Sequence, residues 1–433
     1  MEHFKENFLS YQPYRQMSIS QIFDHGFEYL KKYTFRLEFS LQDYCYREIR
    51  FTYRTFKRSI WMVINAWLAI FYFTIMIFYP NNSYIINRID FEQMLKAERM
   101  DILSIQLIIA FSILEFLWAK MLHKILQYRL SSIDFLVSKS FFDEQKELLP
   151  KSRQYLCHMY MITHSIVTIL YSIVTIELLL VIIIYAYHCF NLYQSFRIDI
   201  IEMIIRVSMF IIWVMHVIQI MGQLFFSFNF LVFLIEFFKV RIEQFYKILQ
   251  QYDQIKPFEK FQRNDLKQFQ HDYLCLYKET AQMNRTVSVL LFYLEAISKS
   301  SIISACIFYS KQSSWSVFTM FIIIAILSTF CLTNGLYSRI SNLPSYNQKC
   351  ARLILQRIAR TQWSMVVDSK GVRPQKLFIY RYSIKSSLFV QTMTNNQFGF
   401  TCGRVFFITK FRYIQLFIMN FILILKFYKK TCL

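Results

Sequence analysis

Apolar residues along the chain are gathered into long blocks, and polar stretches separate these blocks. A block of about 18 or more apolar residues with few charges is typical of a transmembrane helix, because about 20 residues at about 1.5 Å each cross the hydrocarbon core of a bilayer. The last block is shorter, so we expect its helix to begin earlier or to end at a thinned membrane edge. The pattern predicts seven membrane-spanning helices. They occupy residues 60–79, 102–119, 159–187, 203–235, 287–308, 315–337 and 413–428.

The stretches between some of these blocks also carry helical periodicity. Apolar residues continue at helical spacing after the fourth block until Pro257, and helical character resumes before the fifth block. After the sixth block, Leu377, Ile384 and Leu388 fall near one helix face, and Pro374 is placed for a first helical turn. We expect these amphipathic helices to form a bundle below the membrane, with their apolar stripes covered by the same chain or by neighbouring subunits. The predicted organisation is a cytosolic N-terminal segment (1–58), six transmembrane helices with cytosolic helical extensions (59–338), cytosolic anchor helices (339–412), and a seventh transmembrane helix with its tail (413–433).

Basic residues are distributed unequally between the connections. Thirty-nine Lys and Arg lie in the N-terminal segment and in the connections after the second, fourth and sixth blocks, whereas the other three connections hold five. Since basic residues are retained on the cytoplasmic side, the N-terminus is expected inside and the C-terminus outside. Composition agrees with membrane insertion, because 55% of the 433 residues are hydrophobic. The expected fold class is therefore all-α, an integral membrane protein with seven transmembrane helices, cytosolic helical extensions and the N-terminus inside.

The net charge of +21 has two interpretations. A basic balance can indicate nucleic-acid binding, but cytoplasmic loops lying against anionic lipid explain it better. We therefore expect a lipid membrane and no nucleic acid among the partners. The opening fifty residues lack the apolar core of a secretory signal, so the first span is expected to direct insertion. The sequon at Asn81 touches the end of the first span, which leaves its glycosylation open.

Residues suited to catalysis or metal binding form no motif in this sequence. The nine cysteines are scattered without a CxxC pair, so they indicate neither a disulfide framework nor a zinc site. None of the eight histidines belongs to an HExxH motif, and neither GxGxxG nor a P-loop occurs. We expect a protein that is not an enzyme, with no catalytic residue, no metal and no cofactor.

Charged residues within the predicted spans are the stronger lead, because they are costly in a membrane and usually face a cavity or a partner. Glu295 and Lys299 are four residues apart on the fifth span and can pair along one face. They either neutralise each other, or line a ligand cavity or pair with Glu177 or Arg206. Arg206 can also snorkel to the outer surface, and Glu115 is expected to be a structural partner.

Aromatic residues are frequent in what we expect to be the outer halves of spans two to six. Aromatic belts at the membrane surface account for some of them, and others are suited to wall a mostly apolar small-molecule pocket. The sequence leaves these two roles open. The candidate ligand-binding residues are Tyr171, Glu177, Arg206, Trp213, Phe292, Glu295 and Lys299.

The C-terminal stretch from Phe389 to Phe427 resembles the closing segment of insect gustatory receptors, which are relatives of the odorant receptors. In that family a Phe and a Gln on a cytosolic helix are followed by a Phe, a small residue, a Gly and a Phe, and then by a last transmembrane helix. That helix ends in Thr-Tyr, five apolar residues and Gln-Phe, where this chain has Met419-Asn420, five apolar residues and Lys426-Phe427. The matching motif residues are Phe389, Gln391, Phe400, Gly403, Phe406 and Phe427.

The resemblance implies a chemosensory receptor of the plasma membrane that acts as a ligand-gated cation channel. It implies a homotetramer or heterotetramer with related receptors, in which the last helix of each subunit surrounds one pore and the cytosolic bundles meet. The small-molecule ligand, whose tastant class the sequence leaves open, enters the outer half of spans two to six. Met419, Leu423 and Lys426 then line the pore, with Leu423 at an apolar constriction and Lys426 where relatives carry glutamine. Three roles for Lys426 stay open: it snorkels to headgroups, it lines the pore and alters selectivity, or it requires partner subunits that supply glutamine.

Two other classes of membrane protein compete with this interpretation. A G-protein-coupled receptor also has seven spans, but its N-terminus lies outside, which the distribution of basic residues opposes. A transporter or an intramembrane enzyme is disfavoured because the sequence has no internal repeat, broken helix or histidine cluster.

Overall fold

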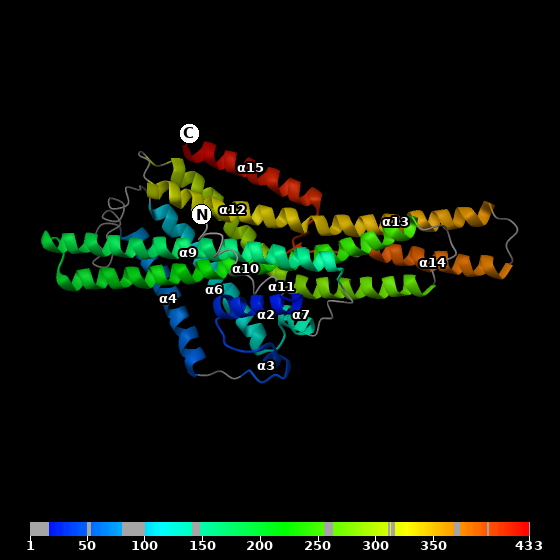
Figure 1. The fold of residues 1–433 in the computed structure, drawn as a ribbon. Helices are drawn as coiled ribbons and strands as arrows, with labels where there is room; N and C mark the ends of the chain where they lie inside the picture. Colours follow the sequence, from blue (N-terminus) through cyan, green and yellow to red (C-terminus); the bar gives the residue numbers. More distant parts are fainter. Residues whose placement is uncertain are drawn as a thin grey trace, which may run out of the picture.

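The computed structural model is almost entirely helical, as Figure 1 shows. It describes residues 17–49, 53–79, 100–140, 148–254, 263–310, 312, 317–367, 373–395 and 398–432. The sequon at Asn81 lies outside these residues, as do the side chains of Leu377, Leu423 and Phe427. The prediction of an all-α fold is confirmed.

The first half of the chain supplies the N-terminal elements and the first four apolar helices. The N-terminal elements are α2 (Ile19–Tyr29), the π-helix η2 (Leu30–Phe35) and α3 (Leu41–Cys45). They are followed by α4 (Tyr53–Phe78), α6 (Met100–Leu126), α7 (Ser131–Ser140), α9 (Pro150–Gln194) and α10 (Ile200–Gln254).

The second half contains four long helices and a small hairpin before the last helix. The helices are α11 (Arg263–Ser310), α12 (Val317–Ile340), α13 (Asn342–Val367) and α14 (Arg373–Asn395). Strands β1 (Thr401–Cys402) and β2 (Phe406–Phe407) precede α15 (Lys410–Cys432). In Figure 1, α13 and α14 form a pair that extends beyond the other helices at one end. Pro374 lies in the first turn of α14, as predicted.

Five helices of the described chain are long and apolar enough to cross a membrane: α4, α6, α9, α10 and α11. Helices α9 and α10 have 45 and 55 residues. At about 1.5 Å per residue they are more than twice as long as the roughly 30 Å hydrocarbon core, so both extend well beyond a bilayer. This confirms that the chain has several helices long and apolar enough to cross a membrane. The last two predicted spans correspond to α12 and α15, which are not among these five.

The surface of α9 is apolar and exposed along most of its length. None of the residues in its most apolar part is buried, and large exposed apolar side chains occur on it from Tyr155 to Tyr193. Within this stretch Ile162 and Tyr187 are about 38 Å apart along the helix at about 1.5 Å per residue, which is longer than a hydrocarbon core of about 30 Å. We use Ile162 and Tyr187 to name the two sides of the long helices.

Two clusters of buried residues hold the fold together. The larger one joins α2, α7, α13 and the hairpin to the parts of α9, α10 and α11 on the Ile162 side. The smaller one joins α4 and α6 to the parts of α9, α10 and α11 on the Tyr187 side. Capping supports the N-terminal elements, since Ser18 and Ser40 each form a capping box with the residue three positions later.

Candidate functional site

The β1–β2 hairpin forms a joint between the helical bundle and α15. Residues Thr401 and Cys402 pair with Phe407 and Phe406, respectively. The hairpin is attached to α11, because the Gly403 amide donates to the Ser288 carbonyl at 2.7 Å and the Thr401 amide donates to the Asn284 side chain at 2.9 Å. Helix α15 begins three residues after β2. The position of α15 is therefore fixed by the contact between the hairpin and α11.

Gly403 is at the turn of this hairpin, where the backbone requires glycine. Its φ is +58°, in the left-handed region that L-residues avoid. A Cβ placed on it would lie 3.3 Å from the Cβ of Phe292, closer than ordinary contact. The glycine of the resembled motif thus has a structural reason, and Phe292 packs against the hairpin.

Cys402 is buried in the same joint beside an ion pair of α11. Its sulfur lies 3.3 Å from the hydroxyl of Tyr337. Burial raises the pKa of the Cys402 thiol, a shift that the hydrogen bond from Tyr337 opposes and that Glu295 increases. Glu295 and Lys299 form the predicted pair, with 3.2 Å between Lys299 Nζ and Glu295 Oε1. The first of the two interpretations, mutual neutralisation, describes this geometry.

Phe389 and Phe400 of the resembled motif belong to the packed core of the joint. The ring centroids of Phe389 and of Phe398, which is not a motif residue, lie 5.5 and 6.1 Å from that of Tyr273 on α11. Phe400 is fully buried with its ring centroid 6.0 Å from that of Phe238 on α10. Phe406 is half-buried, and Gln391 is exposed on α14. The motif therefore ties α10, α11 and α14 to the start of α15.

Helix α15 contacts the rest of the chain along one stripe. Tyr413 and Leu416 pack against the larger core, and Asn420 is only 5% exposed. Met419 is half exposed, and Lys426 is exposed near the end of the helix. Large apolar side chains elsewhere around α15 are 46 to 72% exposed. They are Phe411, Ile414, Phe417, Ile418, Met419, Phe421, Ile422 and Leu425. A single copy of the chain thus leaves most of α15 uncovered, at the edge seen in Figure 1.

A cluster of aromatic rings surrounds Trp213 on the Tyr187 side of the membrane helices. Its ring centroid lies 4.9 Å from that of Phe210, 5.5 Å from that of Phe73 and 6.4 Å from that of Tyr72. Tyr185 stacks on Phe210 at 4.2 Å. The buried indole Nε1 of Trp213 has no hydrogen-bond partner among the described residues. A buried donor without a partner is costly, so Trp213 Nε1 is a polar group of this cluster whose hydrogen-bonding capacity the described residues leave unused.

The structure brings only some of the predicted ligand-binding residues to this cluster. Arg206, which pairs with Glu202 at 2.6 Å, interacts electrostatically with Tyr72 and Tyr185. Tyr171 lies elsewhere, with its ring against Tyr33 and Phe226 at 5.7 and 5.5 Å.

The remaining candidates also lie away from Trp213. Phe292, Glu295 and Lys299 belong to the hairpin joint. Glu177 is half-buried on α9 with one carboxylate oxygen lacking a hydrogen-bond partner in the described chain. The sequence interpretation did not include Tyr72 and Phe73. Both lie in the first span, which was not expected to contribute to the pocket, and only their aromatic character could have indicated them.

A buried ion pair attaches the N-terminal elements to the membrane helices. Arg36, directly after η2, donates to both oxygens of Glu115 on α6 at 2.9 and 2.6 Å. Its guanidinium also lies 5.2 Å from the ring of Trp118, and the Trp118 indole donates to the Phe35 carbonyl at 3.0 Å. Glu115 is therefore a structural partner, as predicted. Arg36 itself was missed.

In the described part of the chain, no three His, Cys, Asp or Glu side chains are grouped so that they could hold a metal ion. The chain matches no protein-family model and no curated protein.

Proposed function

We propose that this protein is a chemosensory receptor of the gustatory type that acts as a ligand-gated cation channel. Four subunits surround one pore, and α15 of each subunit lines it. The observation that carries the proposal is the contrast at the C-terminus: α15 starts from a packed joint that is tied to α11, yet its apolar side chains are exposed on most faces. Such a helix needs lipid and neighbouring copies to cover it.

The same proposal assigns the topology. In this topology α12 and α15 also cross the membrane, in addition to the five long apolar helices, which makes seven spans. The N-terminus lies in the cytosol. The support is the distribution of Lys and Arg, thirty-nine against five between the two sides. The Ile162 side of the long helices is then the cytosolic side, and α13 and α14 form the cytosolic anchor at which subunits meet. Exposed Ile384 and Leu388 on α14 suit such a contact.

The ligand site of the proposal is the aromatic cluster around Trp213. Its rings offer a mostly apolar wall, and the Trp213 Nε1 donor and the Arg206 guanidinium supply polar anchors. This favours a small molecule with an apolar or aromatic body and at least one hydrogen-bond acceptor. Tyr171 and Phe292 are removed from the candidate site because they pack elsewhere.

Lys426 provides the sharpest test of the channel. If it lines the pore, four lysines near its outer end disfavour cations, because rings of cationic side chains repel them. Lys426→Gln should then increase cation conductance and shift the reversal potential at equal surface expression. Lys429→Gln, also exposed on α15, is the matched control and should leave both unchanged.

Each result of this experiment has a clear meaning. Unchanged currents for Lys426→Gln indicate that the lysine snorkels to headgroups. Currents that appear only with a related receptor subunit indicate a heteromeric channel. The proposal fails if purified particles show no four-fold arrangement with α15 at the centre. A G-protein-coupled receptor is the second candidate, and an extracellular N-terminal tag on intact cells would favour it.

A further inference from the structure

Three neighbouring helices change from apolar to charged sequence at the same level of the fold. The apolar part of α10 ends at Glu236, that of α11 begins after Arg285, and that of α12 ends at Arg339. Glu236 and Arg339 form an ion pair at 2.6 Å, so the apolar parts of α10 and α12 end side by side. Such a change marks the boundary of the hydrocarbon core on a membrane helix.

The β1–β2 hairpin lies at this level. The Gly403 amide donates to the carbonyl of Ser288, three residues after the charge that precedes the apolar part of α11. Cys402 Sγ lies 3.3 Å from the hydroxyl of Tyr337, two residues before the charge that ends the apolar part of α12. The apolar part of α15 then begins directly after Arg412. In the proposed topology the hairpin therefore lies at the cytosolic membrane surface.

Basic and apolar side chains are exposed together around the hairpin. Val405 and Phe411 are 70 and 72% exposed, and each directly follows an exposed basic residue in the sequence. Further exposed basic residues lie on α11 and in the first turn of α15. We call this set the hairpin patch, and its members are Arg285, Arg404, Val405, Lys410, Phe411 and Arg412.

Two arginines of the patch start from neighbouring points of the backbone. Arg285 directly follows Asn284, whose side chain accepts from the hairpin at 2.9 Å. Arg404 directly follows Gly403, whose amide donates to α11 at 2.7 Å. The guanidinium groups of both arginines can therefore reach one ligand, although they come from segments that are far apart in the sequence.

No acidic side chain of the described chain forms an ion pair with the basic residues of the patch. The two acidic residues that flank this part of α11 are already paired, Glu279 with two basic side chains and Glu295 with Lys299. The Arg412 guanidinium donates to an uncharged group, the Gln415 side-chain oxygen, at 2.9 Å. The patch therefore presents positive charge that its own surroundings do not balance.

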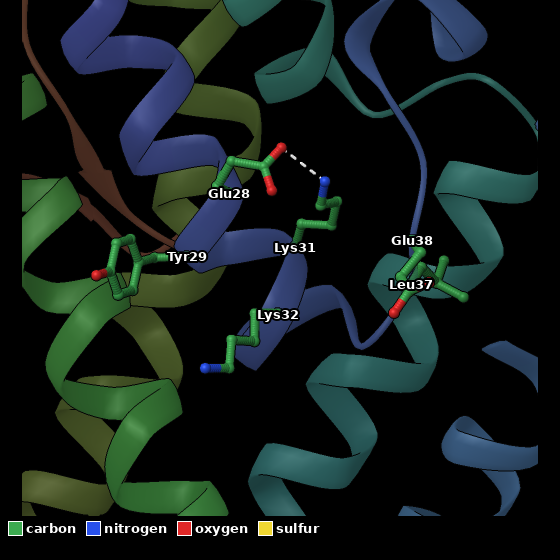
Figure 2. Close-up of a pocket in the computed structure, with 6 residues that line it drawn as sticks. All are labelled: Glu28, Tyr29, Lys31, Lys32, Leu37 and Glu38. Atoms are coloured by element: carbon green, nitrogen blue, oxygen red, sulfur yellow. Dashed lines mark hydrogen bonds and ion pairs between the residues drawn. The ribbon is translucent and has the colours of Figure 1, made fainter. Parts of the chain in front are cut away.

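The pocket on α2 and η2 provides the opposite case. Its volume is about 450 Å³, and two lysines and two glutamates contribute to its lining. Lys31 Nζ lies 2.6 Å from Glu28 Oε1, the dashed contact in Figure 2. The charges of this pocket are balanced within it, so it offers no net charge to an anion.

We propose that the hairpin patch binds the phosphate of an anionic phospholipid from the adjacent leaflet. Arg285 and Arg404 donate to the phosphate oxygens, which planar guanidinium groups bind with two parallel hydrogen bonds. The acyl chains lie along Val405 and Phe411, and Lys410 adds electrostatic attraction. A zwitterionic phospholipid would bring an ammonium group to four cations with no carboxylate to receive it, and it therefore binds more weakly.

Charge also favours lipid over a second copy of the chain as the occupant. The chain carries a net charge of +21, and no Asp or Glu follows Asp368. An anionic leaflet supplies the complementary charge, and the cytoplasmic leaflet is the anionic one. The inference rests on the part of the proposed function that places α10, α11 and α15 across the membrane. It does not depend on a pore, a tetramer or a taste ligand.

The experiment measures phospholipid binding to the purified full-length protein by native mass spectrometry in detergent. Phosphatidylglycerol and phosphatidylcholine are titrated separately, since both carry a phosphate diester and only the second carries a cationic group. We expect phosphatidylglycerol to bind about tenfold more tightly. Arg404→Gln combined with Lys410→Gln should weaken its binding at least about tenfold, because each basic residue near an anionic lipid contributes a factor of about five. The matched control is Lys267→Gln with Lys385→Gln, two exposed lysines of α11 and α14 outside the patch, which should bind as wild type does.

Further variants distinguish charge from folding and lipid from a free anion. Arg404→Lys with Lys410→Arg keeps both charges and should retain binding. Val405→Ser with Phe411→Ser should weaken phosphatidylglycerol binding while the charges persist. Displacement of the lipid by millimolar inorganic phosphate would indicate a free-phosphate site and would overturn the proposal.

The outcomes separate this proposal from the channel. Equal binding of the two lipids by wild type, or equal phosphatidylglycerol binding by wild type and the Arg404→Gln, Lys410→Gln variant, would refute the lipid site. A change in subunit number without a change in lipid binding would mean that the patch is a subunit contact, which also refutes it. Particles without four-fold symmetry that keep the preference for phosphatidylglycerol would instead remove the channel and leave the lipid site.

Discussion

Arg36 connects the N-terminal elements to the membrane helices, and its replacement by glutamine tests how much that connection contributes. The Arg36 side chain is 0% exposed and that of Glu115 is 15% exposed. Removing one partner of a buried ion pair typically costs about 3 to 5 kcal/mol, because the other charge stays buried without compensation. Arg36→Gln should therefore release α2 and η2 from α6 and α10 while the long helices persist.

Hydrogen–deuterium exchange over residues 17–45 measures this release directly. A loss of about 3 kcal/mol in the free energy of local opening corresponds to roughly a hundredfold faster exchange, since each 1.4 kcal/mol is about a factor of ten. The matched control is Glu28→Gln, which breaks an ion pair whose carboxylate is 61% exposed. Exposed pairs contribute about 1 kcal/mol or less, so this variant should change exchange by no more than about fivefold.

Two further variants separate the charge from the backbone. Arg36 has a φ of 58°, in the left-handed region, which costs a non-glycine residue about 1 to 2 kcal/mol. Arg36→Gly removes the ion pair and this strain together, so its loss should be smaller than that of Arg36→Gln by about that amount. Arg36→Gln combined with Glu115→Gln removes both charges and should recover part of the loss. Equal exchange rates for Arg36→Gln and the Glu28→Gln control would refute this account.

Two other predictions concern the hairpin joint and the histidine of α2. Gly403→Ala should destabilise the joint by about 1 to 2 kcal/mol and lower the yield of correctly folded protein, because an alanine is strained at φ +58° and crowds Phe292. Gly335→Ala on α12, where nothing lies within 4 Å of the added Cβ, is the control and should be tolerated. Burial lowers the pKa of His25 from its ordinary 6.5, against an opposing effect of Glu28. The unfolded segment therefore binds the proton more tightly, and the docking of α2 should weaken as the pH falls below 6.5. Protection of the α2 amides relative to their intrinsic exchange rate should then fall with acid. Protection that does not fall, or that falls equally in His25→Gln, would contradict this.

The long apolar helices were predictable because a helix long enough to cross a membrane needs an uninterrupted run of about 20 apolar residues, which is visible in the sequence. Blocks such as 102–119 and 203–235 lie within α6 and α10, and the i, i+4 spacing of Glu295 and Lys299 gave their ion pair. The glycine at 403 belonged to a recognised pattern, whose physical reason is the positive φ and the contact with Phe292. Local spacing and local backbone geometry carry these features.

Contacts between distant segments were not predictable in the same way. The ion pair of Arg36 and Glu115 joins residues 79 positions apart, and a single arginine in a polar segment has no periodic signal. The packing neighbour of Phe292 was not predictable either. It was expected to wall a ligand pocket, yet it packs on the hairpin. The sequence shows which residues follow one another along α11, but it does not show which other segment packs against each helical turn.

Helix α11 connects the two regions to which the proposal assigns ligand and pore. On the side of the aromatic cluster, Ser301 accepts from the Gln106 amide of α6 at 2.8 Å, and Ser304 donates to the same side chain at 3.2 Å. At the other end of its membrane part, Asn284 and Ser288 hold the hairpin that leads into α15. The helix is continuous between these contacts.

A displacement of α6 against α11 near the cluster must therefore bend α11, break the Gln106 hydrogen bonds, or move the hairpin. Bending a continuous helix opposes its own hydrogen bonds, and breaking the Gln106 contacts leaves buried polar groups without partners. Moving the hairpin carries α15 with it, and α15 is free to follow because most of its described surface is not packed against this chain.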